Sequence, residues 1–589
     1  MKAPSALAIR ARDLRKSFRR ETGELVKALD GVSIEAHQGE LTALVGPDGA
    51  GKTTLIRLMA GLMTPDAGML EVLGLDVAEK PQQIQDRLGY MPQRFGLYED
   101  LSVEENLDLY ADLHGVSSAR RREQYPRLME MTALGAFRDR LARKLSGGMK
   151  QKLGLACTLI GEPALLLLDE PTVGVDPLSR RELWKIILHL VHDQALTVLL
   201  STSYLHEAER CSNVVVLYSG KTLAQGCPGE ISNFAHARSA VADPPRGRTA
   251  RWFQARLLSD PAIVDAAPDA GQVRFVYSDT GSPAHGVLAG TRVIGVEPRF
   301  EDGFMVLLKR YADQQPGVDM SPTPQCQQRG DEVIVEVRDL VRKFGDFTAV
   351  DHISFEVRRG EIFGLLGPNG AGKTTTFRML CGLLPATNGA LSIAGMDLRL
   401  SRASARQRIG YVAQKFSLYG HLTVAENLEF FASAYGLRGS SKRNRIEWAL
   451  QQFGLGPFEQ LAAAQLPGGY KQRLAMAAAL LHQPEILFLD EPTSGADPLA
   501  RREFWRRVTA LAEQGVTVIV TTHFMEEAEY CDRLVIMDAG RILAQGTPAG
   551  IRSRARAEQG GEPTMEDAFI AIVEDARQHS DEIAERGAA

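Results

Sequence analysis

The sequence predicts an α/β protein built from two copies of one domain. The stretch GPDGAGKTT at 46–54 recurs as GPNGAGKTT at 367–375, and each copy stands between an apolar run and a segment with helical spacing. The apolar runs ALLLLDEP at 164–171 and EILFLDEP at 485–492 are typical of fully buried parallel strands. Because the spacing between the copies is domain-sized, the repeat indicates two domains and excludes a solenoid.

The composition is that of a folded protein with no general affinity for polyanions. The chain has 589 residues, of which 44% are hydrophobic and 24% charged, and its formal net charge is −5. This balance excludes a disordered chain and gives no indication of binding nucleic acid through phosphate neutralisation. The six cysteines have no metal-ligand spacing, and no run is long and apolar enough for a signal peptide or a membrane span. We therefore expect a cytoplasmic protein.

The segment between the copies differs from both of them. VRFVYS and TRVIGVEP are short alternating runs that predict strands of a small accessory subdomain. QQPGVDMSPTPQCQQRGDE, from 314, is rich in Pro, Gln and Gly and is typical of a linker. The expected organisation is a first domain, an accessory α+β extension of that domain, a linker, a second domain and a short helical tail, at 1–231, 232–312, 313–331, 332–551 and 552–589.

The repeated glycine-rich stretches match the pattern GxxxxGK[ST] and predict two phosphate-binding loops. In such a loop backbone N–H groups and a helix N-terminus surround the phosphates of a nucleotide, the lysine reaches the β and γ oxygens, and the hydroxyl binds Mg²⁺. A glycine turn beside an exposed lysine would explain one match but not two copies with the same partners downstream. The predicted ATP-binding residues are Gly46, Pro47, Asp48, Gly49, Ala50, Gly51, Lys52, Thr53 and Thr54, and Gly367, Pro368, Asn369, Gly370, Ala371, Gly372, Lys373, Thr374 and Thr375.

Each apolar run that follows ends in Asp-Glu, which predicts two carboxylates at the end of a buried strand. The first acid, Asp169 or Asp490, is expected to hold Mg²⁺ through water. The second acid, Glu170 or Glu491, is placed to polarise the water that attacks the γ-phosphate, which is the work of a general base. An acidic turn closing a strand would account for the acids but not for their recurrence downstream of a phosphate loop.

At this point both copies, roughly 7–230 and 333–550, resemble the nucleotide-binding domains of ABC ATPases. The most specific element is the signature LSGGMKQK, upstream of LLLLDEPTVGVDP. The resemblance implies two P-loop NTPase domains, each with a mostly parallel sheet, an antiparallel β subdomain and a helical subdomain that carries the signature. It also implies head-to-tail pairing of the two domains, with each ATP between one phosphate loop and the other signature. The residues implied are Ser146, Gly147, Gly148, Gly468 and Gly469 of the signatures, Gln93 and Gln414 near Mg²⁺, Phe18 and Phe344 against adenine, and Asp176 and Asp497 of the crossing loops.

The sequence departs from the family pattern in three places. Pro467 replaces the signature serine in the second copy and offers neither hydroxyl nor N–H, while Ser203 stands in the first copy where the second has the family's histidine, His523. Under head-to-tail pairing both changes fall in the ATP site of the first phosphate loop, where Asp48 also replaces the usual asparagine. We therefore expect a slow first site and a second site, with Glu491 and His523, that turns over.

The resemblance further implies what the ATPase drives. The expected function is that of an ATP-binding and ATP-hydrolysing subunit, with ATP and Mg²⁺ as cofactors, that powers two membrane permease subunits of a type 2 exporter for drugs or related substrates. The permease would dock on the surface that follows Gln93 and Gln414, so the chain would lie on the cytoplasmic face of the inner membrane. Ribosome-associated translation factors and importer ATPases are the alternatives. A linker without a long charged helix disfavours the first, and an intact second loop disfavours the second.

Overall fold

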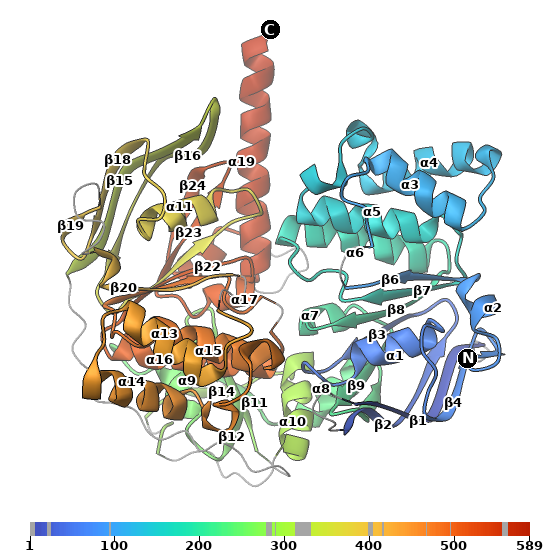
Figure 1. Ribbon diagram of the computed structural model, residues 1–589, viewed down its shortest axis with the longest axis horizontal. Helices are drawn as coiled ribbons and strands as arrows, with labels where there is room; N and C mark the ends of the chain where they lie inside the picture. Colours follow the sequence, from blue (N-terminus) through green and yellow to red (C-terminus); the bar gives the residue numbers. More distant parts are fainter. Residues whose placement is uncertain are drawn as a thin grey trace. The chain divides into compact units, whose positions relative to one another are not determined.

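The computed structural model describes residues 6–19, 25–93, 96–278, 286–288, 290–312, 332–398, 405–414, 418–466, 468–494, 496–555 and 563–588. The chain divides into two compact units (Figure 1). Unit 1 comprises Met1–Ser239, Glu297–Ala312 and Asp497–Leu499, and unit 2 comprises Ala240–Val296, Asp313–Ala496 and Ala500–Ala589. The expected linker at 313–331 lies outside the described residues, as does Pro467.

Unit 1 is built on a six-stranded sheet of order β10-β9-β3-β8-β7-β6. Its strands are parallel except for β10, which pairs with β9 in the antiparallel sense. A second, antiparallel sheet has the order β2-β1-β4-β5. The strands are β1 (Leu7–Arg19), β2 (Leu25–His37), β3 (Leu41–Val45), β4 (Ala67–Val72), β5 (Leu75–Asp76), β6 (Leu88–Met91), β7 (Leu165–Asp169), β8 (Thr197–Thr202), β9 (Asn213–Tyr218) and β10 (Lys221–Gly226).

Helices cover the sheet of unit 1 and form a separate helical part. The helical part consists of α3 (Val103–Leu113), α4 (Ser118–Thr132) and α5 (Gly147–Leu159) (Figure 1). The other helices are α1 (Lys52–Met59), α2 (Pro81–Gln85), α6 (Pro177–His192), α7 (Leu205–Ala208), α8 (Pro228–Ser232) and α10 (Phe300–Ala312). α10 packs against α7 and α8, so the chain returns to unit 1 after the accessory segment.

Unit 2 repeats this architecture, with a six-stranded sheet of order β20-β21-β22-β17-β23-β24 and an antiparallel sheet of order β16-β15-β18-β19. The strands are β15 (Val333–Phe344), β16 (Phe347–Arg358), β17 (Ile362–Leu366), β18 (Asn388–Ile393), β19 (Met396–Asp397), β20 (Ile409–Val412), β21 (Ile486–Asp490), β22 (Thr517–Thr522), β23 (Arg533–Asp538) and β24 (Arg541–Gly546). The helices are α11 (Lys373–Leu380), α13 (Val424–Ala434), α14 (Gly439–Gln452), α15 (Gly468–Leu480), α16 (Pro498–Glu513), α17 (Met525–Ala528), α18 (Pro548–Arg552) and α19 (Met565–Ala588). The predicted fold class is therefore confirmed in both copies.

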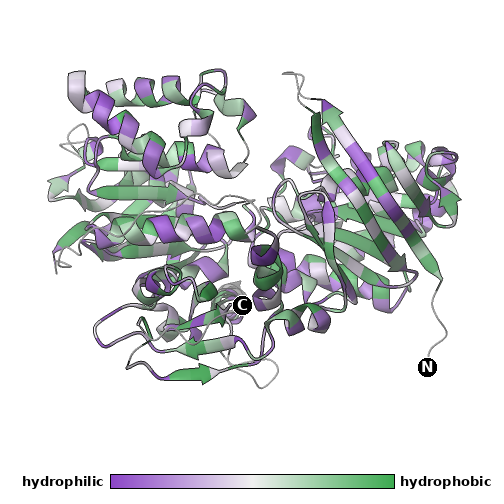
Figure 2. Ribbon diagram, turned by 90° about the horizontal axis from the view of Figure 1, so that it is seen from below, coloured by the Kyte–Doolittle hydropathy of each residue, from purple (hydrophilic) through white to green (hydrophobic). Residues whose placement is uncertain are grey.

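The hydropathy of the strands explains why each sheet is central. Every residue of β7 and β21 is buried, in keeping with strands covered on both faces. Hydrophobic and hydrophilic residues mix along the long antiparallel strands and on the helices (Figure 2), unlike the uniformly buried β7 and β21. The one-residue change of register between the copies lies in the turn after α6 and α16, which runs over 193–196 in unit 1 and 514–516 in unit 2.

The accessory subdomain forms its own small sheet and packs with unit 2. Its sheet has the order β12-β13-β11-β14. Phe253 and Leu257 of α9 are buried in its core with Val273 and Phe275 of β13. Its elements are β11 (Ser239–Ala242), α9 (Ala250–Leu257), β12 (Ile263–Asp269), β13 (Gln272–Tyr277) and β14 (Val293–Gly295). The sequence predicted residues 232–312 as an extension of the first domain; in the structure residues 240–296 group with unit 2 and residues 297–312 with unit 1.

Charged side chains explain why the accessory subdomain belongs to unit 2. Arg251 is only 3% exposed. Its guanidinium donates two hydrogen bonds to Asp532, from Nε to Oδ1 at 3.2 Å and from Nη2 to Oδ2 at 2.8 Å. Asp269 accepts a hydrogen bond from Arg552 at 2.7 Å, and Asp265 accepts one from Arg502 at 3.3 Å. These long-range ion pairs have no signature in local sequence.

No described helix is both long enough and apolar enough to cross a membrane.

Replacing Arg251 with methionine tests this attachment. The variant leaves Asp532 in a largely buried position without its guanidinium, so we expect docking of the accessory subdomain to weaken by about 3 kcal/mol. Hydrogen exchange over 240–296 should accelerate, while Arg256→Met, on the exposed side of α9, should leave it unchanged. Equal exchange in the two variants would show that the ion pair does not hold the subdomain.

Candidate functional site

In both units the phosphate loop connects a buried strand to a helix. β3 leads into α1, which begins at Lys52, and β17 leads into α11, which begins at Lys373. The residue before each helix is a glycine in the left-handed region, Gly51 at φ 102° and Gly372 at φ 94°. A Cβ on Gly51 would lie 2.6 Å from the carbonyl oxygen of Ala28, and one on Gly372 would lie 2.5 Å from that of Ala349. Only glycine fits at these positions.

Each loop lysine is buried and folds back over its own loop. The Nζ of Lys52 donates to the carbonyl oxygens of Gly46 at 2.7 Å and Pro47 at 3.2 Å. The Nζ of Lys373 makes the same bonds to Gly367 at 2.6 Å and Pro368 at 2.9 Å. The ammonium group is thus held by carbonyl oxygens of its own loop, next to a helix N-terminus of the kind that binds phosphate.

A hydroxyl on the neighbouring strand joins the two acids at the end of the central strand. In unit 1 the Oγ of Ser201 donates to Asp169 Oδ1 at 2.6 Å and accepts from the N–H of Glu170 at 2.9 Å. In unit 2 Thr521 makes the same two bonds to Asp490 and Glu491, at 2.6 and 3.0 Å. Sequence reasoning missed this hydroxyl, because only pairing of the parallel strands brings it beside the acids.

The two glutamates sit on unusual backbone. Glu170 has φ 50° and Glu491 has φ 45°, both in the left-handed region that non-glycine residues rarely adopt. Such a conformation costs about 1 kcal/mol or more and persists where surrounding bonds impose it, often at functional sites. Here the bond to the strand hydroxyl fixes the peptide N–H of each glutamate.

The glutamine that follows the first edge strand of each sheet reaches the glutamate. The Nε2 of Gln93 donates to Glu170 Oε2 at 2.7 Å, and the Nε2 of Gln414 donates to Glu491 Oε2 at 2.6 Å. The structure therefore brings together the predicted glutamine and glutamate in each unit. Lys52 lies 3.7 Å from Glu170 in unit 1, and both of these side chains are buried.

The histidine makes the two units differ. His523 is buried after β22, and its Nδ1 lies 3.2 Å from Glu491 Oε2. Ser203 occupies the corresponding position after β8 and is also buried. Its short side chain cannot provide an imidazole to Glu170. His206, further along the chain, lies 3.4 Å from Nη1 of Arg180 instead.

This difference changes the electrostatics of the two glutamates. Burial raises the pKa of Glu170, and the neighbouring carboxylates Asp169 and Asp48 add to that effect against Lys52. Burial also acts to raise the pKa of Glu491, but His523, Lys373 and Gln414 outweigh it, so that the pKa of Glu491 is lowered. The carboxylate is the form that can take a proton from water, and it is favoured in unit 2.

The residues around Asp169 suit a hard divalent cation. Thr53 donates to Asp169 Oδ1 at 3.2 Å, which leaves Asp169 Oδ2 buried and with no hydrogen-bond partner among the described residues. A hydroxyl, a carboxylate oxygen and a glutamine are oxygen donors of the kind Mg²⁺ prefers. In unit 2 Asp490 and Gln414 take the corresponding positions, and burial raises the pKa of Asp490.

The signature segments begin two matching helices. Ser146 is the N-cap of α5, and its Oγ accepts from the N–H of Met149 at 3.2 Å. Gly148 packs closely on α6, since a Cβ there would lie 2.3 Å from that of Ser179. In unit 2 α15 begins at Gly468, directly after Pro467, and Gly469 has more room, with Ala500 at 3.8 Å.

The predicted adenine-stacking residues are surface aromatics. Phe18 near the end of β1 is 40% exposed, and Phe344 at the end of β15 is 47% exposed. A cation lies over each ring, Lys16 over Phe18 and Arg342 over Phe344. Neither ring belongs to a hydrophobic core. The side chain of Asp48 is likewise exposed in its loop.

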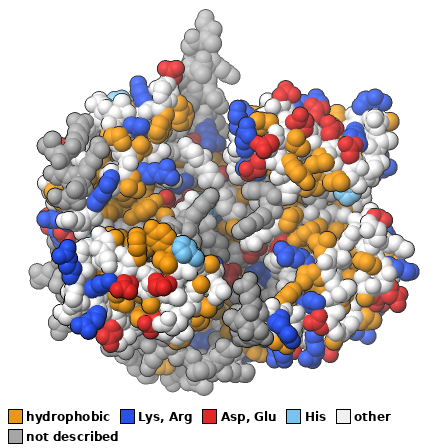
Figure 3. Space-filling model, viewed as in Figure 1, with side chains coloured by type: hydrophobic (Ala, Val, Ile, Leu, Met, Phe, Trp, Pro, Cys, Tyr) orange, Lys and Arg blue, Asp and Glu red, His pale blue; other side chains and the backbone are white. Residues whose placement is uncertain are grey.

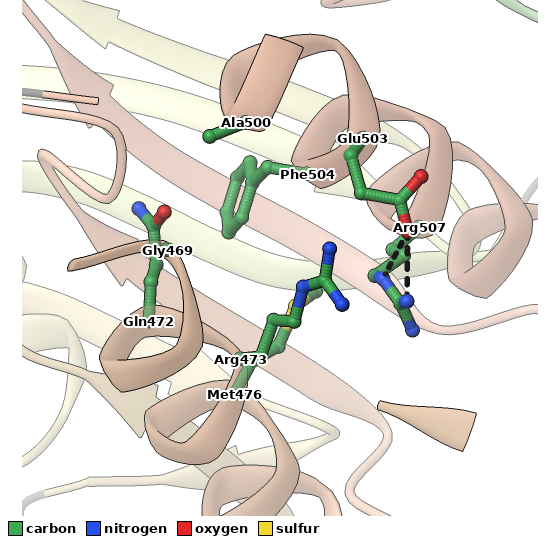
Figure 4. A pocket seen from close by; sticks show the side chains of 8 residues that line it. All are labelled: Gly469, Gln472, Arg473, Met476, Ala500, Glu503, Phe504 and Arg507. Carbon is green, nitrogen blue, oxygen red and sulfur yellow. Dashed lines mark hydrogen bonds and ion pairs between the residues drawn. The ribbon is translucent and has the colours of Figure 1, made fainter. Parts of the chain in front are cut away.

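A small pocket in unit 2 is separate from the phosphate loop. It lies between α15 and α16 and contains a Glu503–Arg507 ion pair of 2.7 Å (Figure 4). Its walls are Gly469, Gln472, Arg473, Met476, Ala500, Glu503, Phe504 and Arg507. These walls include Gly469 of the signature but no residue of the phosphate loop, so this pocket is not the triphosphate-binding surface.

Sequence reasoning also missed two pairs of buried polar residues. Asn106 and Asn427 hold the loop after each glutamine, and Glu207 and Glu527 lie fully buried after β8 and β22. Their signal was present in the sequence as a repeat, because each residue occupies the same place in both copies.

Comparisons with known proteins identify the family to which the chain is similar. The family described as ABC transporter matches residues 29–173 and 350–494. The chain is 49% identical over 558 residues to the "Probable multidrug ABC transporter ATP-binding protein YbhF" of Escherichia coli (strain K12). The aligned region covers 93% of this chain and 95% of the relative. It is 41% identical over 222 residues to the "Linearmycin resistance ATP-binding protein LnrL" of Bacillus subtilis (strain 168), covering 38% of this chain and 71% of that one. A solved ATP binding subunit of an ABC transporter is 31% identical, with a TM-score of 0.37, over 41% of this chain and 99% of that chain.

The signature glycines provide a test of the packing in each unit. Gly148→Ala places a methyl group against Ser179, so we expect it to lower the free energy of unfolding of unit 1 by about 1–3 kcal/mol. Gly469→Ala has room for the methyl group, so the better helix propensity of alanine should leave unit 2 at least as stable. Hydrogen exchange of α5 and α15 under mild denaturant measures both. Equal destabilisation by the two substitutions would contradict the different spacing.

Proposed function

Because the chain belongs to the ATP-binding proteins of ABC transporters and is an ATPase, we propose that it powers a separate membrane permease and that its two ATP sites work at different rates. The observation that carries the second part is the 3.2 Å contact between His523 and Glu491, for which unit 1 has only Ser203. The name of the multidrug relative, which matches nearly the whole chain, supports export of drugs or related substrates.

In the proposed reaction each phosphate loop binds one ATP. Lys52 and Lys373 exchange their bonds to the loop carbonyls for bonds to the β and γ oxygens. Thr53, Gln93 and Asp169 hold Mg²⁺ in unit 1, and Thr374, Gln414 and Asp490 hold it in unit 2. The cation supplies neutralisation of the phosphate charge. The glycines of both signatures contribute N–H groups, and Phe18 and Phe344 stack on adenine.

Glu491 is the proposed general base of the faster site. Its lowered pKa keeps the carboxylate ionised, and Gln414 and His523 orient its Oε2. Glu170 takes the same role in unit 1 with a raised pKa and without an imidazole. Since Glu170, Lys52 and Asp169 are all in place, unit 1 is proposed to hydrolyse slowly and to hold ATP for longer.

The proposed permease surface follows the two glutamines. Tyr98 and Leu113 are exposed at 60% and 71% in unit 1, and Tyr419 and Phe430 are exposed at 42% and 45% in unit 2. The rings of Tyr419 and Phe430 pack edge to face at 4.8 Å. Hydrophobic side chains gather over the helical part of unit 2 (Figure 3). Exposed aromatic clusters of this kind mark sites of protein contact.

A buried asparagine makes this surface rigid. The side chain of Asn427 accepts from the N–H of Tyr419 at 3.0 Å and donates to its carbonyl oxygen at 3.0 Å. Asn106 makes the corresponding bonds to Tyr98, at 2.9 and 3.1 Å. Each tyrosine is therefore presented from a fixed backbone, which lowers the entropy cost of docking. A chain docked in this way would lie at the cytoplasmic face of the cell membrane.

The two glutamates separate the sites experimentally. Loss of a general base costs about 100-fold or more at its own site. Glu491→Gln is therefore expected to lower ATP turnover at least about tenfold, leaving the slow first site, whereas Glu170→Gln should lower it by no more than about twofold. Phosphate release at saturating ATP measures both, with nucleotide binding as the control for folding. Equal losses would overturn the proposed asymmetry.

Purification from detergent-solubilised membranes tests the permease. We expect the full chain to carry integral membrane subunits with several spans, and the double variant Tyr419→Ala/Phe430→Ala to lose most of them while still binding ATP. Phe347→Ala removes an even more exposed ring from the antiparallel sheet and should retain them. Recovery of ribosomes or DNA in place of membrane subunits would refute the transport function.

A further inference from the structure

We propose that Glu527 is a positioning residue for hydrolysis in unit 2, fastening the strand end that carries His523 to the segment that follows Glu491. The proposal rests on the function proposed above for these two residues. It adds a completely buried side chain that the signature motifs do not include.

The contacts of Glu527 join three parts of unit 2. Its carboxylate accepts hydrogen bonds from the hydroxyls of Thr522, at 2.6 Å, and Thr493. Thr522 is the residue before His523, and Thr493 is the second residue after Glu491. Arg501 of α16 lies 3.9 Å away and adds the third part.

The same bonds explain why the strand end is rigid. The hydroxyl of Thr522 donates to Glu527 and accepts from the N–H of Phe524 at 2.9 Å, so the backbone on both sides of His523 is held. On the other side, the N–H of Ser494 donates to the carbonyl oxygen of Glu491 at 3.2 Å, which closes the turn that contains Thr493. One carboxylate thereby links the backbone beside His523 to the turn after Glu491, and so sets the distance between the imidazole and the Glu491 carboxylate.

Unit 1 contains the same arrangement independently. Glu207 accepts from Thr172 at 3.0 Å, from Thr202 at 2.6 Å and from the indole N–H of Trp184 at 2.9 Å. Ser203 follows Thr202 there, so the network forms without the histidine. The hydrogen-bond network is therefore common to both domains. In unit 2 the strand end that it holds also carries the imidazole of His523.

Stability alone does not account for this carboxylate. Glu527 is completely buried, and burial raises its pKa to about 7 although Arg501 and Thr522 act to lower it. An acid with a raised pKa in the folded state loses folding free energy as the pH rises from its ordinary value through 7, because the unfolded chain releases the proton more readily. Above pH 7 the ionised group therefore costs stability, while its acceptor oxygens orient two hydroxyls.

Glu527→Gln is the direct test, made in the full chain carrying Glu170→Gln so that phosphate release reports mainly the second site. The amide keeps the volume but can accept at only one oxygen, so Thr493 and Thr522 cannot both donate as before. Misplacement of catalytic groups by a fraction of an ångström costs rate but little ground-state binding. We expect kcat to fall about tenfold with KM for ATP unchanged within about twofold.

Glu526→Gln is the matched control. Glu526 is the preceding residue on α17, it is exposed, and it pairs with Arg501 at 3.2 Å, whereas the hydroxyls of Thr493 and Thr522 donate to Glu527. We expect it to retain kcat. The thermal midpoint of Glu527→Gln at pH 8 should lie within a few degrees of the midpoint of its Glu170→Gln parent. The variant removes a buried charge, and Arg501 retains its ion pair with Glu526.

Two further variants separate the possible failures. Thr493→Val and Thr522→Val each remove one donor, and each should lower kcat less than Glu527→Gln does; they also serve if Glu527→Gln fails to fold. An unchanged kcat in Glu527→Gln, or a rise in KM that matches the fall in kcat, would overturn the positioning role. Equal turnover in the Glu170→Gln and Glu491→Gln parents would instead refute the proposed asymmetry and would leave the contrast between Glu527→Gln and Glu526→Gln intact.

Discussion

The structure depends on one hydrogen-bonded junction at the carboxyl end of each parallel sheet. A strand hydroxyl, Ser201 or Thr521, accepts the N–H of the glutamate and donates to the aspartate before it. These two hydrogen bonds hold the backbone of the glutamate in the left-handed region. That conformation turns the glutamate side chain away from the strand direction. The glutamine then reaches the glutamate from the edge strand, and the lysine loop follows β3 or β17, the strand that pairs with the one carrying the hydroxyl. Because parallel strands end at the same edge, four separate segments meet there.

The two copies of this junction differ in the electrostatic environment of their glutamates. The backbone frame, the lysine and the glutamine are shared, so the difference comes from the residue after β8 or β22 and from Asp48, whose carboxylate raises the pKa of Glu170 and which stands where unit 2 has Asn369. With His523 in contact, the pKa of Glu491 falls, whereas burial dominates at Glu170 and its pKa rises. A duplicated domain can thus vary the rate of a site without altering the fold around it, since a serine fits in the space of the histidine.

The accessory subdomain makes polar contacts with the second copy close to its functional strand end. Its Asp269 and the N–H of Ala270 meet Arg552 and Glu529, and Glu529 directly follows the helix that carries Glu527. In unit 1 the equivalent Glu209 instead accepts the N–H of Phe300 at the start of α10. The residue after α7 or α17, the short helix that follows β8 or β22, is therefore hydrogen-bonded to another segment in both units. That segment is α10 in unit 1, and the accessory subdomain with α18 in unit 2.

The sequence by itself determined the features that short stretches of chain encode. Glycine spacing, apolar runs and acid pairs specify backbone turns, buried strands and strand ends, so the turns before Lys52 and Lys373, the acid pairs at the strand ends and the α/β fold could be predicted from the sequence. The contrast between His523 and Ser203 was also visible, because the repeat aligns them. Only the tertiary structure decided which residues support these groups. Ser201, Thr521, Glu207 and Glu527 act across strands or helices, residues 240–296 pack with the later domain through ion pairs between distant positions, and Phe18 and Phe344 lie on the surface. Such contacts depend on which elements come together in space, and no local pattern encodes that.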